Sequence, residues 1–231
     1  MLELKNVSFR YAKNLPLVLD GVSLSFDKGE FVAITGRNGS GKTTITRLLT
    51  GLEKPASGDI VYNGTSVTKE DASKRSRFIG YVFQQPDRQM FMPTVREEIA
   101  FGPFHQGKRG QELEDAIDRA MADTDTESLS AEYPRTLSRG DQQRVAIARA
   151  LAKNPKLLLC DEPTGALDYK TGKQVLALLQ RTCRETGRTV IVITHNTALT
   201  AMADRIIQVK SGQILSNKVN EHPVPVEQIE W

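Results

Sequence analysis

The sequence has little of what secreted or membrane-spanning proteins depend on. Its 231 residues contain two cysteines, Cys160 and Cys183, which are too few for a disulfide framework and fit a reducing cytoplasm. No apolar run approaches the roughly 20 residues that a helix needs to cross a bilayer. The chain opens on MLELK, without the apolar core of a signal peptide. We therefore expect a protein that acts on any membrane from outside it.

The sequence also has no large excess of positive or negative charge. The 31 lysines and arginines are nearly balanced by 28 aspartates and glutamates, and a net charge of +3 gives no strong reason to expect a nucleic acid as partner. Internal repeats and low-complexity segments are also missing, which excludes repeat architectures. The length suffices for one domain, 1–231, that carries a subdomain.

The most informative stretch that is present is residues 36–44. It reads GRNGSGKTT and fits the phosphate-loop pattern G-x-x-x-x-G-K-[ST]. Glycines let backbone N–H groups face phosphate oxygens, while Lys42 supplies charge to the β- and γ-phosphates and Thr43 is placed to ligate Mg²⁺. An apolar run at 30–35 and a helical pattern from 44 supply the strand and helix that the motif requires, which argues against an accidental glycine-rich turn. The predicted nucleotide-binding residues of this loop are Gly36, Arg37, Asn38, Gly39, Ser40, Gly41, Lys42, Thr43 and Thr44.

The other patterns predict an α/β fold, a P-loop NTPase (RecA-like) core with a mostly parallel sheet. Alternating apolar residues predict an N-terminal antiparallel β subdomain within 2–26, and apolar runs predict buried strands at 79–83 and 189–194. A charged helical pattern at 111–121 indicates an inserted helical subdomain. We expect the α/β core to comprise about 1–85 and 154–216, the helical subdomain about 86–153, and a polar, loosely held tail 217–231.

Polar residues follow two of the apolar runs. Asp161 and Glu162 end one strand, where a carboxylate near the phosphate loop can hold Mg²⁺ and its neighbour can orient or deprotonate a water. Two solvated acids that begin a turn are the alternative. His195 ends the strand 189–194, and ligands of parallel sheets gather at such strand ends, so a γ-phosphate-sensing role is favoured over a structural one.

A second anion site is indicated at residues 137–144, which read LSRGDQQR and lead into an amphipathic helix. Ser138 and Gly140 at a helix N-terminus can bind phosphate. Because one molecule already has a phosphate loop, a second site makes sense when another copy supplies it across an interface. We therefore predict a head-to-tail dimer that holds two ATP molecules between its subunits.

These motifs, in this order, resemble the nucleotide-binding ATPase subunit of ABC transporters over residues 1 to about 216. The resemblance assigns adenine stacking to Tyr11, which on its own favours simple packing in a turn. It makes Gln84 the residue that bridges Mg²⁺ and the membrane partner, and it places Asp168 in a dimer-contact loop. The implied catalytic residues are Glu162, His195, Gln84 and Lys42, the implied Mg²⁺ ligands are Thr43, Gln84 and Asp161, and the implied signature residues, which act in trans, are Ser138, Arg139, Gly140 and Asp141.

The same resemblance implies the cofactors and partners. ATP and Mg²⁺ are the expected cofactors, and ATP hydrolysis that powers transport is the expected activity. The expected partners are a second ATPase subunit, identical or different, and integral membrane permease subunits, with no nucleic acid. The resemblance implies a peripheral position on the cytoplasmic face of the cell membrane.

The signature departs from the family pattern at two positions. The usual motif is LSGGQ, whereas this chain has Arg139 in place of a glycine and Asp141 in place of the glutamine. Ser138 and Gly140 are kept, so the phosphate contact is expected to survive. Arg139 could add charge toward the γ-phosphate or pair with an acid, and both readings stay open. Gly165 stands where serine is common, which is expected to be a mild change.

The motifs conflict about the transporter branch. Residues 82–103 resemble the energy-coupling-factor branch, whose ATPases drive vitamin and transition-metal uptake. Residues 148–151 and 161–168 look more like the lipoprotein-release and macrolide-export branch. We favour the energy-coupling-factor branch because residues after Gln84 face the membrane partner. A soluble ABC ATPase of DNA repair or translation is the less favoured alternative, since the chain has neither a long coiled coil nor a second ATPase domain, and a small-molecule kinase leaves the signature unexplained.

Overall fold

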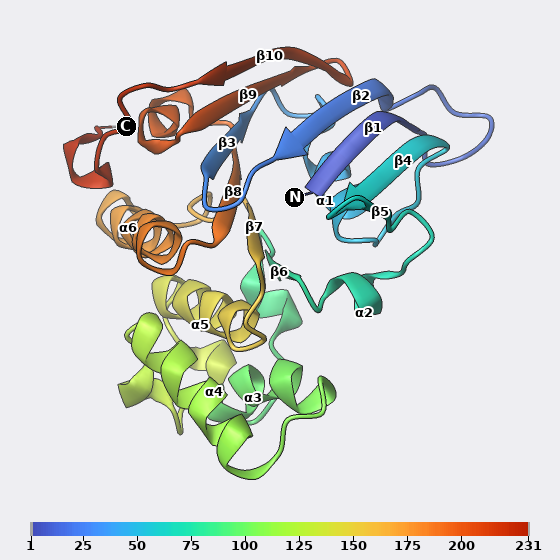
Figure 1. Ribbon diagram of the computed structural model, residues 1–231. Coiled ribbons are helices and arrows are strands. Elements are labelled where there is room, and N and C mark those ends of the chain that lie inside the picture. The colour runs from blue at the N-terminus through green and yellow to red at the C-terminus, as the bar shows by residue number, and fades with distance from the viewer. Residues whose placement is uncertain (1, 231) are drawn as a thin grey trace.

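A six-stranded sheet forms the centre of the molecule in the computed structural model, which describes residues 2–230 (Figure 1). Its strand order is β10-β9-β3-β8-β7-β6, and all neighbours are parallel except the β9–β10 hairpin. Every residue of β3, β7 and β8 is buried, as expected of parallel strands covered on both faces. The strands are β3 (Phe31–Thr35), β6 (Ile79–Val82), β7 (Leu157–Asp161), β8 (Thr189–Thr194), β9 (Arg205–Lys210) and β10 (Gln213–Val219).

A smaller antiparallel sheet of order β2-β1-β4-β5 lies beside the central one. It confirms the predicted N-terminal β subdomain. Its strands are β1 (Leu2–Phe9), β2 (Leu19–Phe26), β4 (Ser57–Tyr62) and β5 (Thr65–Ser66). The helix α1 (Lys42–Leu49) shares one apolar core with both sheets, since its Ile45, Leu48 and Leu49 pack in the same cluster as residues of β1 and β3. The phosphate loop is thereby held between the two sheets.

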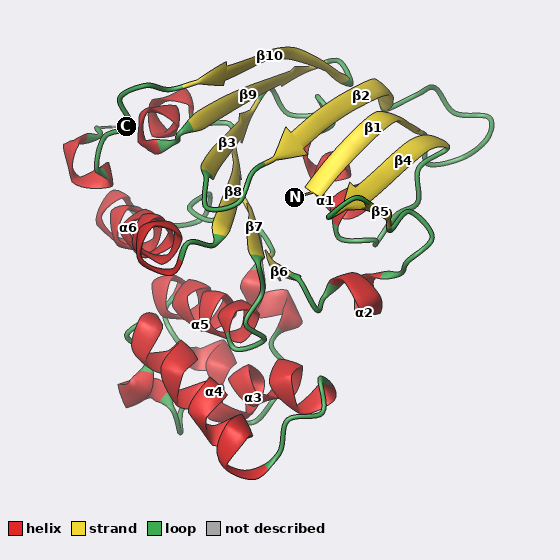
Figure 2. Cartoon of the chain, in the orientation of Figure 1, coloured by secondary structure: helices red, strands yellow, loops and turns green. Residues whose placement is uncertain are grey.

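Most of the helices gather at one end of the molecule, away from the antiparallel sheet (Figure 2). The inserted unit contains α3 (Val95–His105), α4 (Gly110–Asp123), α5 (Arg139–Leu151) and the short 3-10 turns η1 (Pro86–Gln89), η2 (Glu127–Leu129) and η3 (Pro134–Thr136). Its predicted helical character is confirmed. Fully buried Glu98 ties the unit together, because it accepts hydrogen bonds from the N–H groups of Phe91 and Met92 and pairs with Arg149 at 2.6 Å.

Helix α6 (Tyr169–Thr186) covers one face of the central sheet. Its Val175, Leu176 and Leu179 pack in the same apolar cluster as Ala33 of β3 and Val190 of β8. The remaining short elements are α2 (Ala72–Arg75), η4 (Thr197–Met202) and η5 (Val226–Gln228). No helix among residues 2–230 is long and apolar enough to cross a membrane.

A buried arginine holds the far end of α1. The side chain of Arg75 is fully buried and donates hydrogen bonds to the carbonyl groups of Leu48 and Leu49, at 2.6 and 3.0 Å, and to that of Val67 at 2.6 Å. It therefore satisfies the C-terminal carbonyl groups of a helix, which have no partner within the helix itself.

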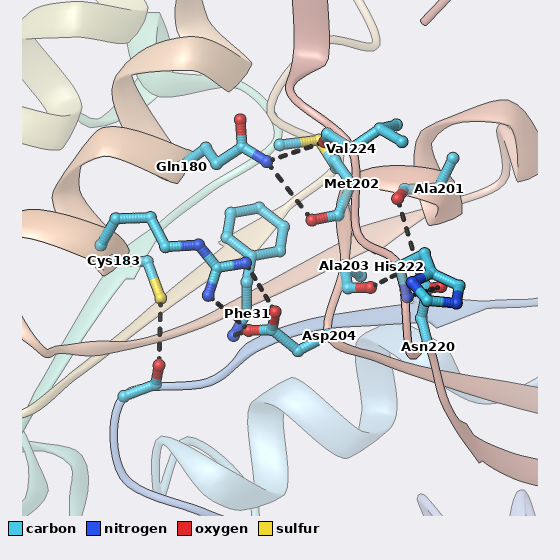
Figure 3. Close-up of polar contacts among 12 residues, drawn as sticks. Phe31, Gln180, Cys183, Ala201, Met202, Ala203, Asp204, Asn220, His222 and Val224 are labelled. Atoms are coloured by element: carbon cyan, nitrogen blue, oxygen red, sulfur yellow. Dashed lines mark hydrogen bonds and ion pairs between the residues drawn. The ribbon is translucent and has the colours of Figure 1, made fainter. Parts of the chain in front are cut away.

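The expectation of a loosely held tail is wrong. The side-chain amide of Gln180 on α6 donates to the carbonyl group of Val224 at 3.1 Å (Figure 3). The oxygen of the same side chain accepts from the N–H of Val226 at 3.2 Å. Asn220 donates to the carbonyl groups of Ala201 and Ala203. Val226 and Ile229 are buried in the core beside α6, and burial of these two apolar residues explains why a mostly polar segment is ordered.

Candidate functional site

Three parallel neighbours, β3, β8 and β7, end at one edge of the central sheet. The register pairs Thr35 with Thr194 and Asp161 with Ile193, so the strand ends lie level with one another. The residues that follow these ends are the phosphate loop, His195 and Glu162. The structure thus brings together at one edge the groups that the sequence predicts for the nucleotide site.

The phosphate loop depends on glycine where it approaches other backbone. Gly36 has φ +153°, and a Cβ there would lie 2.3 Å from the carbonyl oxygen of Val209. Gly41 has φ +107° and directly precedes α1. The loop curls around the buried Lys42 ammonium, which donates to the carbonyl groups of Gly36 and Arg37 at 2.7 and 3.1 Å. A positive charge is therefore held at the centre of the loop.

Tyr11 lies beside this loop although it is far away in sequence. Its hydroxyl is 3.2 Å from the hydroxyl of Thr44, and its ring packs edge-on against Phe9 at 4.9 Å between centroids. About half of the residue remains exposed, at 52%. The position suits both readings of Tyr11, packing and contact with a base.

Asp161 is a buried carboxylate with an incomplete set of partners. One oxygen accepts a hydrogen bond from the Tyr81 hydroxyl at 3.3 Å, while Oδ1 is buried without a hydrogen-bond partner. Burial raises the pKa of Asp161, and hydrogen bonds from Thr43 and Tyr81 offset this only in part. A buried carboxylate oxygen without a partner, next to the Thr43 hydroxyl, fits a hard cation such as Mg²⁺.

Glu162 and His195 touch each other. His195 Nδ1 lies 2.9 Å from Glu162 Oε2, and the side-chain exposure is 11% for Glu162 and 59% for His195. Glu162 has φ +49°, a left-handed conformation that is uncommon for a residue with a Cβ and tends to occur at functional sites. The sequence predicts both residues at strand ends, but no sequence pattern indicates their direct contact.

Gln84 is exposed. Within residues 2–230 it makes no hydrogen bond with Asp161, and its Nε2 lies 4.0 Å from where a Cβ on Gly165 would be. It borders a hollow of about 180 Å³ together with Arg139, Gln143 and Leu167. The structure therefore places Gln84 beside the predicted signature and dimer-contact segments, and its metal-bridging role stays a prediction.

The signature residues stand at the start of α5. Ser138 is the N-cap residue, and its hydroxyl accepts a hydrogen bond from the N–H of Asp141. Gly140 is buried, and a Cβ there would lie 2.3 Å from Cγ2 of Thr171, so this glycine is required by packing against α6. Asp168 caps α6 in the same manner, through the N–H of Thr171 at 3.1 Å. Arg139 is exposed.

A groove of about 760 Å³ lies between the central sheet and the helical unit. The sequence predicts a surface for the membrane partner after Gln84, but not the other walls of this groove. Aromatic residues line it, including Tyr81, Phe83, Phe91 and Phe101, and its lining residues include no aspartate or glutamate. Lys153 also borders this groove. The sequence signal for it is the three phenylalanines spaced along residues 83–101, at Phe83, Phe91 and Phe101.

Comparison with known proteins supports this picture at the level of the family. A family model described as ABC transporter matches residues 19–165. The energy-coupling factor transporter ATP-binding protein EcfA of Methanothermobacter thermautotrophicus is 36% identical over 219 residues, which cover 94% of this chain and 70% of the relative. The macrolide export ATP-binding/permease protein MacB of Campylobacter jejuni is 39% identical over 225 residues, which cover 96% of this chain and 34% of the relative.

A putative ABC transporter ATP-binding protein of Caldanaerobacter subterraneus is 38% identical over 215 residues, or 93% of this chain. The chain spans 37% of the length of that relative and 34% of MacB.

Two solved structures share the fold. CbiO1 from Clostridium perfringens, part of the ABC transporter complex CbiONQ, has a TM-score of 0.87 and 31% identity over 94% of this chain and 88% of its own. The ATP-binding cassette MJ0796, in a dimeric post-hydrolysis state bound to ADP and Pi, has a TM-score of 0.82 and 34% identity over 95% of this chain and 98% of its own.

Proposed function

Because the chain belongs to the ABC transporter family and carries its ATPase domain, we propose that it dimerises around two ATP molecules and powers transport through membrane partner subunits. The observation that carries the proposal is the meeting of the phosphate loop, Asp161 and the Glu162–His195 pair at one sheet edge. The proposed location is the cytoplasmic face of the membrane.

The phosphate loop binds the triphosphate. Backbone N–H groups of residues 36–44 and the N-terminus of α1 contact phosphate oxygens, and Lys42 exchanges its bonds to loop carbonyl groups for bonds to the β- and γ-phosphates. The half-exposed ring of Tyr11 stacks on adenine. Thr44, which contacts the Tyr11 hydroxyl, links the base end of the site to the loop.

Asp161 and Thr43 would hold Mg²⁺, with phosphate oxygens as further ligands and Gln84 contributing when its segment moves inward. Within the described part of the chain no three His, Cys, Asp or Glu side chains form a metal cluster, which agrees with Mg²⁺ bound through few carboxylates and substrate phosphates. When bound, the ion supplies positive charge that stabilises the phosphoryl group in the transition state.

Glu162 is the group that positions or deprotonates the attacking water. Its side chain is largely buried and held by His195 Nδ1, so it is oriented before any water arrives. The His195 ring is mostly exposed at the strand end, where it can contact the γ-phosphate as it releases Glu162. Lys42 and His195 then offset the negative charge that develops during in-line attack.

A second subunit closes the site with Ser138, Arg139, Gly140 and Asp141. Support comes from the exposed position of Ser138 at a helix N-terminus, and from the dimeric form of the relative MJ0796 with ADP and Pi. Asp168, exposed at the start of α6, contacts the partner in the same interface. Two such sites form in one dimer, whether the two subunits are identical or different.

The membrane partner docks in the groove next to Gln84. Its aromatic lining between the sheet and the helical unit suits the apolar side of a helix, and closure of the dimer changes its shape. Uptake of a vitamin or metal ion by an energy-coupling-factor transporter is the favoured function, supported by the similarity to EcfA and CbiO1. The similarity to MacB supports the second candidate, the ATPase of an export complex.

The test is the substitution Glu162→Gln. It removes the base but keeps the shape, so we expect ATP-dependent dimerisation with hydrolysis reduced roughly 10²- to 10⁴-fold. Phosphate release and analytical ultracentrifugation with ATP and Mg²⁺ measure the two effects, with Glu185→Gln on the exposed surface of α6 as the matched control. Normal turnover in Glu162→Gln would overturn the assignment.

A further inference from the structure

The Ser138 hydroxyl already donates its proton in a hydrogen bond within its own subunit. Ser138 Oγ donates a hydrogen bond to Asp141 Oδ2 at 2.7 Å and accepts one from the N–H of Asp141 at 3.2 Å. A serine hydroxyl has one proton to donate. As long as Asp141 receives it, Ser138 cannot donate to any other acceptor.

Asp141 is a carboxylate rather than a carboxylic acid. It forms an ion pair with Arg144, which also donates to the carbonyl group of Asp125 at 2.9 Å. Burial opposes ionisation of Asp141, but hydrogen bonds from Arg144 and Ser138 outweigh it and lower the pKa of this group. The bond from Ser138 is therefore charge-assisted, and such bonds are roughly twice as strong as neutral ones.

We propose that Asp141 is a positioning residue that restrains the Ser138 hydroxyl and raises the ATP concentration needed to close the dimer. The inference rests on the proposed function, in which Ser138 contacts the γ-phosphate of the partner subunit's ATP. On closure, Ser138 must redirect its O–H hydrogen bond from the Asp141 carboxylate to the γ-phosphate, so little free energy is gained by the exchange. The glutamine usual at this position has an NH₂ group, which can donate to Ser138 and leave the hydroxyl proton available for phosphate.

The test compares Asp141→Asn with its parent, both carrying Glu162→Gln so that dimers persist. Asparagine has nearly the same shape as aspartate, but it is neutral and can donate to Ser138. We expect the ATP concentration at half-maximal dimerisation to fall roughly three- to tenfold, the net effect of one ordinary hydrogen bond. Analytical ultracentrifugation across an ATP titration measures it.

A double-mutant cycle with Ser138→Ala separates positioning from simple charge removal. If Asp141 acts through Ser138, Asp141→Asn has no effect once residue 138 is alanine. Glu97→Gln is the matched control, because Glu97 accepts from the hydroxyl of Thr94, the N-cap residue of α3, at 2.9 Å and donates its N–H to that hydroxyl at 3.2 Å, as Asp141 does with Ser138. It is expected to leave dimerisation unchanged.

Each outcome decides a different point. An unchanged ATP requirement in Asp141→Asn, or an equal gain in the Ser138→Ala background, overturns the role of Asp141 while the proposed function stands. Failure of the Glu162→Gln parent to dimerise with ATP overturns the proposed dimer and this inference together. Thermal unfolding of each variant shows whether a change in dimerisation instead follows a loss of folded protein.

Discussion

Lys153 is a cation placed against an apolar wall. It borders the groove, and its side chain covers Gly102, where an added Cβ would lie 2.7 Å from Cγ of Lys153. Within residues 2–230 it has no ion-pair partner, and the nearby charge is another cation, Arg149, which is itself paired with Glu98. Burial and the charge of Arg149 lower the pKa of Lys153 to about 8. The folded state therefore carries a poorly solvated charge at neutral pH.

The sign of the pH effect follows from linkage. Between pH 8 and the unfolded pKa of about 10.4 the unfolded chain binds more protons at this site than the folded one, so the contribution of Lys153 to stability rises with pH. We expect Lys153→Met, which removes the charge, to be more stable than wild type at pH 7. This advantage should shrink as pH rises from about 8 to 10, and urea unfolding of both proteins at each pH measures it.

A difference between the two proteins that stays constant from pH 7 to pH 10 would contradict the assignment. Lys210→Met at an exposed position is the control, and it is expected to show no such pH-dependent difference.

Single residues of the site could be predicted where a strand end fixes them. Lys42 follows from the phosphate-loop pattern, while Asp161 and His195 follow from apolar runs that end in polar residues, because parallel strands bring their carboxyl ends to one edge. The contact of Glu162 with His195 could not be predicted, since it depends on a left-handed backbone at Glu162. The depressed pKa of Lys153 likewise depends on the packing of α3 beside it, which no periodicity encodes.

Among the elements, α6 and the segment after β10 form one unit. Gln180 bonds to Val224 and Val226 from the middle of α6, and the carbonyl group of Glu227 accepts from Lys173 about two turns nearer the start of the helix. After β10 the sequence has four apolar residues besides proline, Val224, Val226, Ile229 and Trp231, too few for a periodic signal. Two of them, Val226 and Ile229, are buried. The segment is ordered because those residues reach a core formed by other elements.

A substitution within this segment and one at the last residue of β10 are expected to differ in their effect on stability. Val226→Asp buries a charge without a partner, so we expect the free energy of unfolding to fall by about 3 kcal/mol or more. Val219→Asp, at a position that is 75% exposed, is expected to change it by less than about 0.5 kcal/mol. Chemical denaturation measures both, and equal stability of the two variants would show that the segment contributes little.

At the scale of the whole molecule, the groove and the nucleotide edge are joined through the 84–89 segment. This segment borders the hollow next to the signature on one side and contributes Gln89 to the groove on the other. The segment therefore connects the proposed docking site in the groove with the signature residues proposed to close over ATP. The fold class, the helical insertion and a partner surface after Gln84 could be predicted from the motifs, whereas the other walls of the groove could not, because they come from separate stretches of chain.

The groove gives a prediction about the partner. Phe101 lines it and packs edge-on against Phe91 at 4.9 Å, so Phe101→Asp should abolish co-purification of a membrane protein with the tagged chain from detergent-solubilised source membranes. Phe104→Asp, at a 44% exposed position outside the groove lining, should leave the complex intact. Mass spectrometry of the eluates identifies the partner, and equal recovery with both variants would place the docking surface elsewhere.

The buried guanidinium of Arg75 has an electrical consequence for the phosphate loop. A helix carries about half a positive charge at its N-terminus and half a negative charge at its C-terminus, and in a helix as short as α1 the two partly cancel at a distance. Arg75 lies at the negative end and contacts its carbonyl groups. The helix therefore presents an unbalanced positive end to the loop, so a residue far from any phosphate strengthens the attraction of the site for anions.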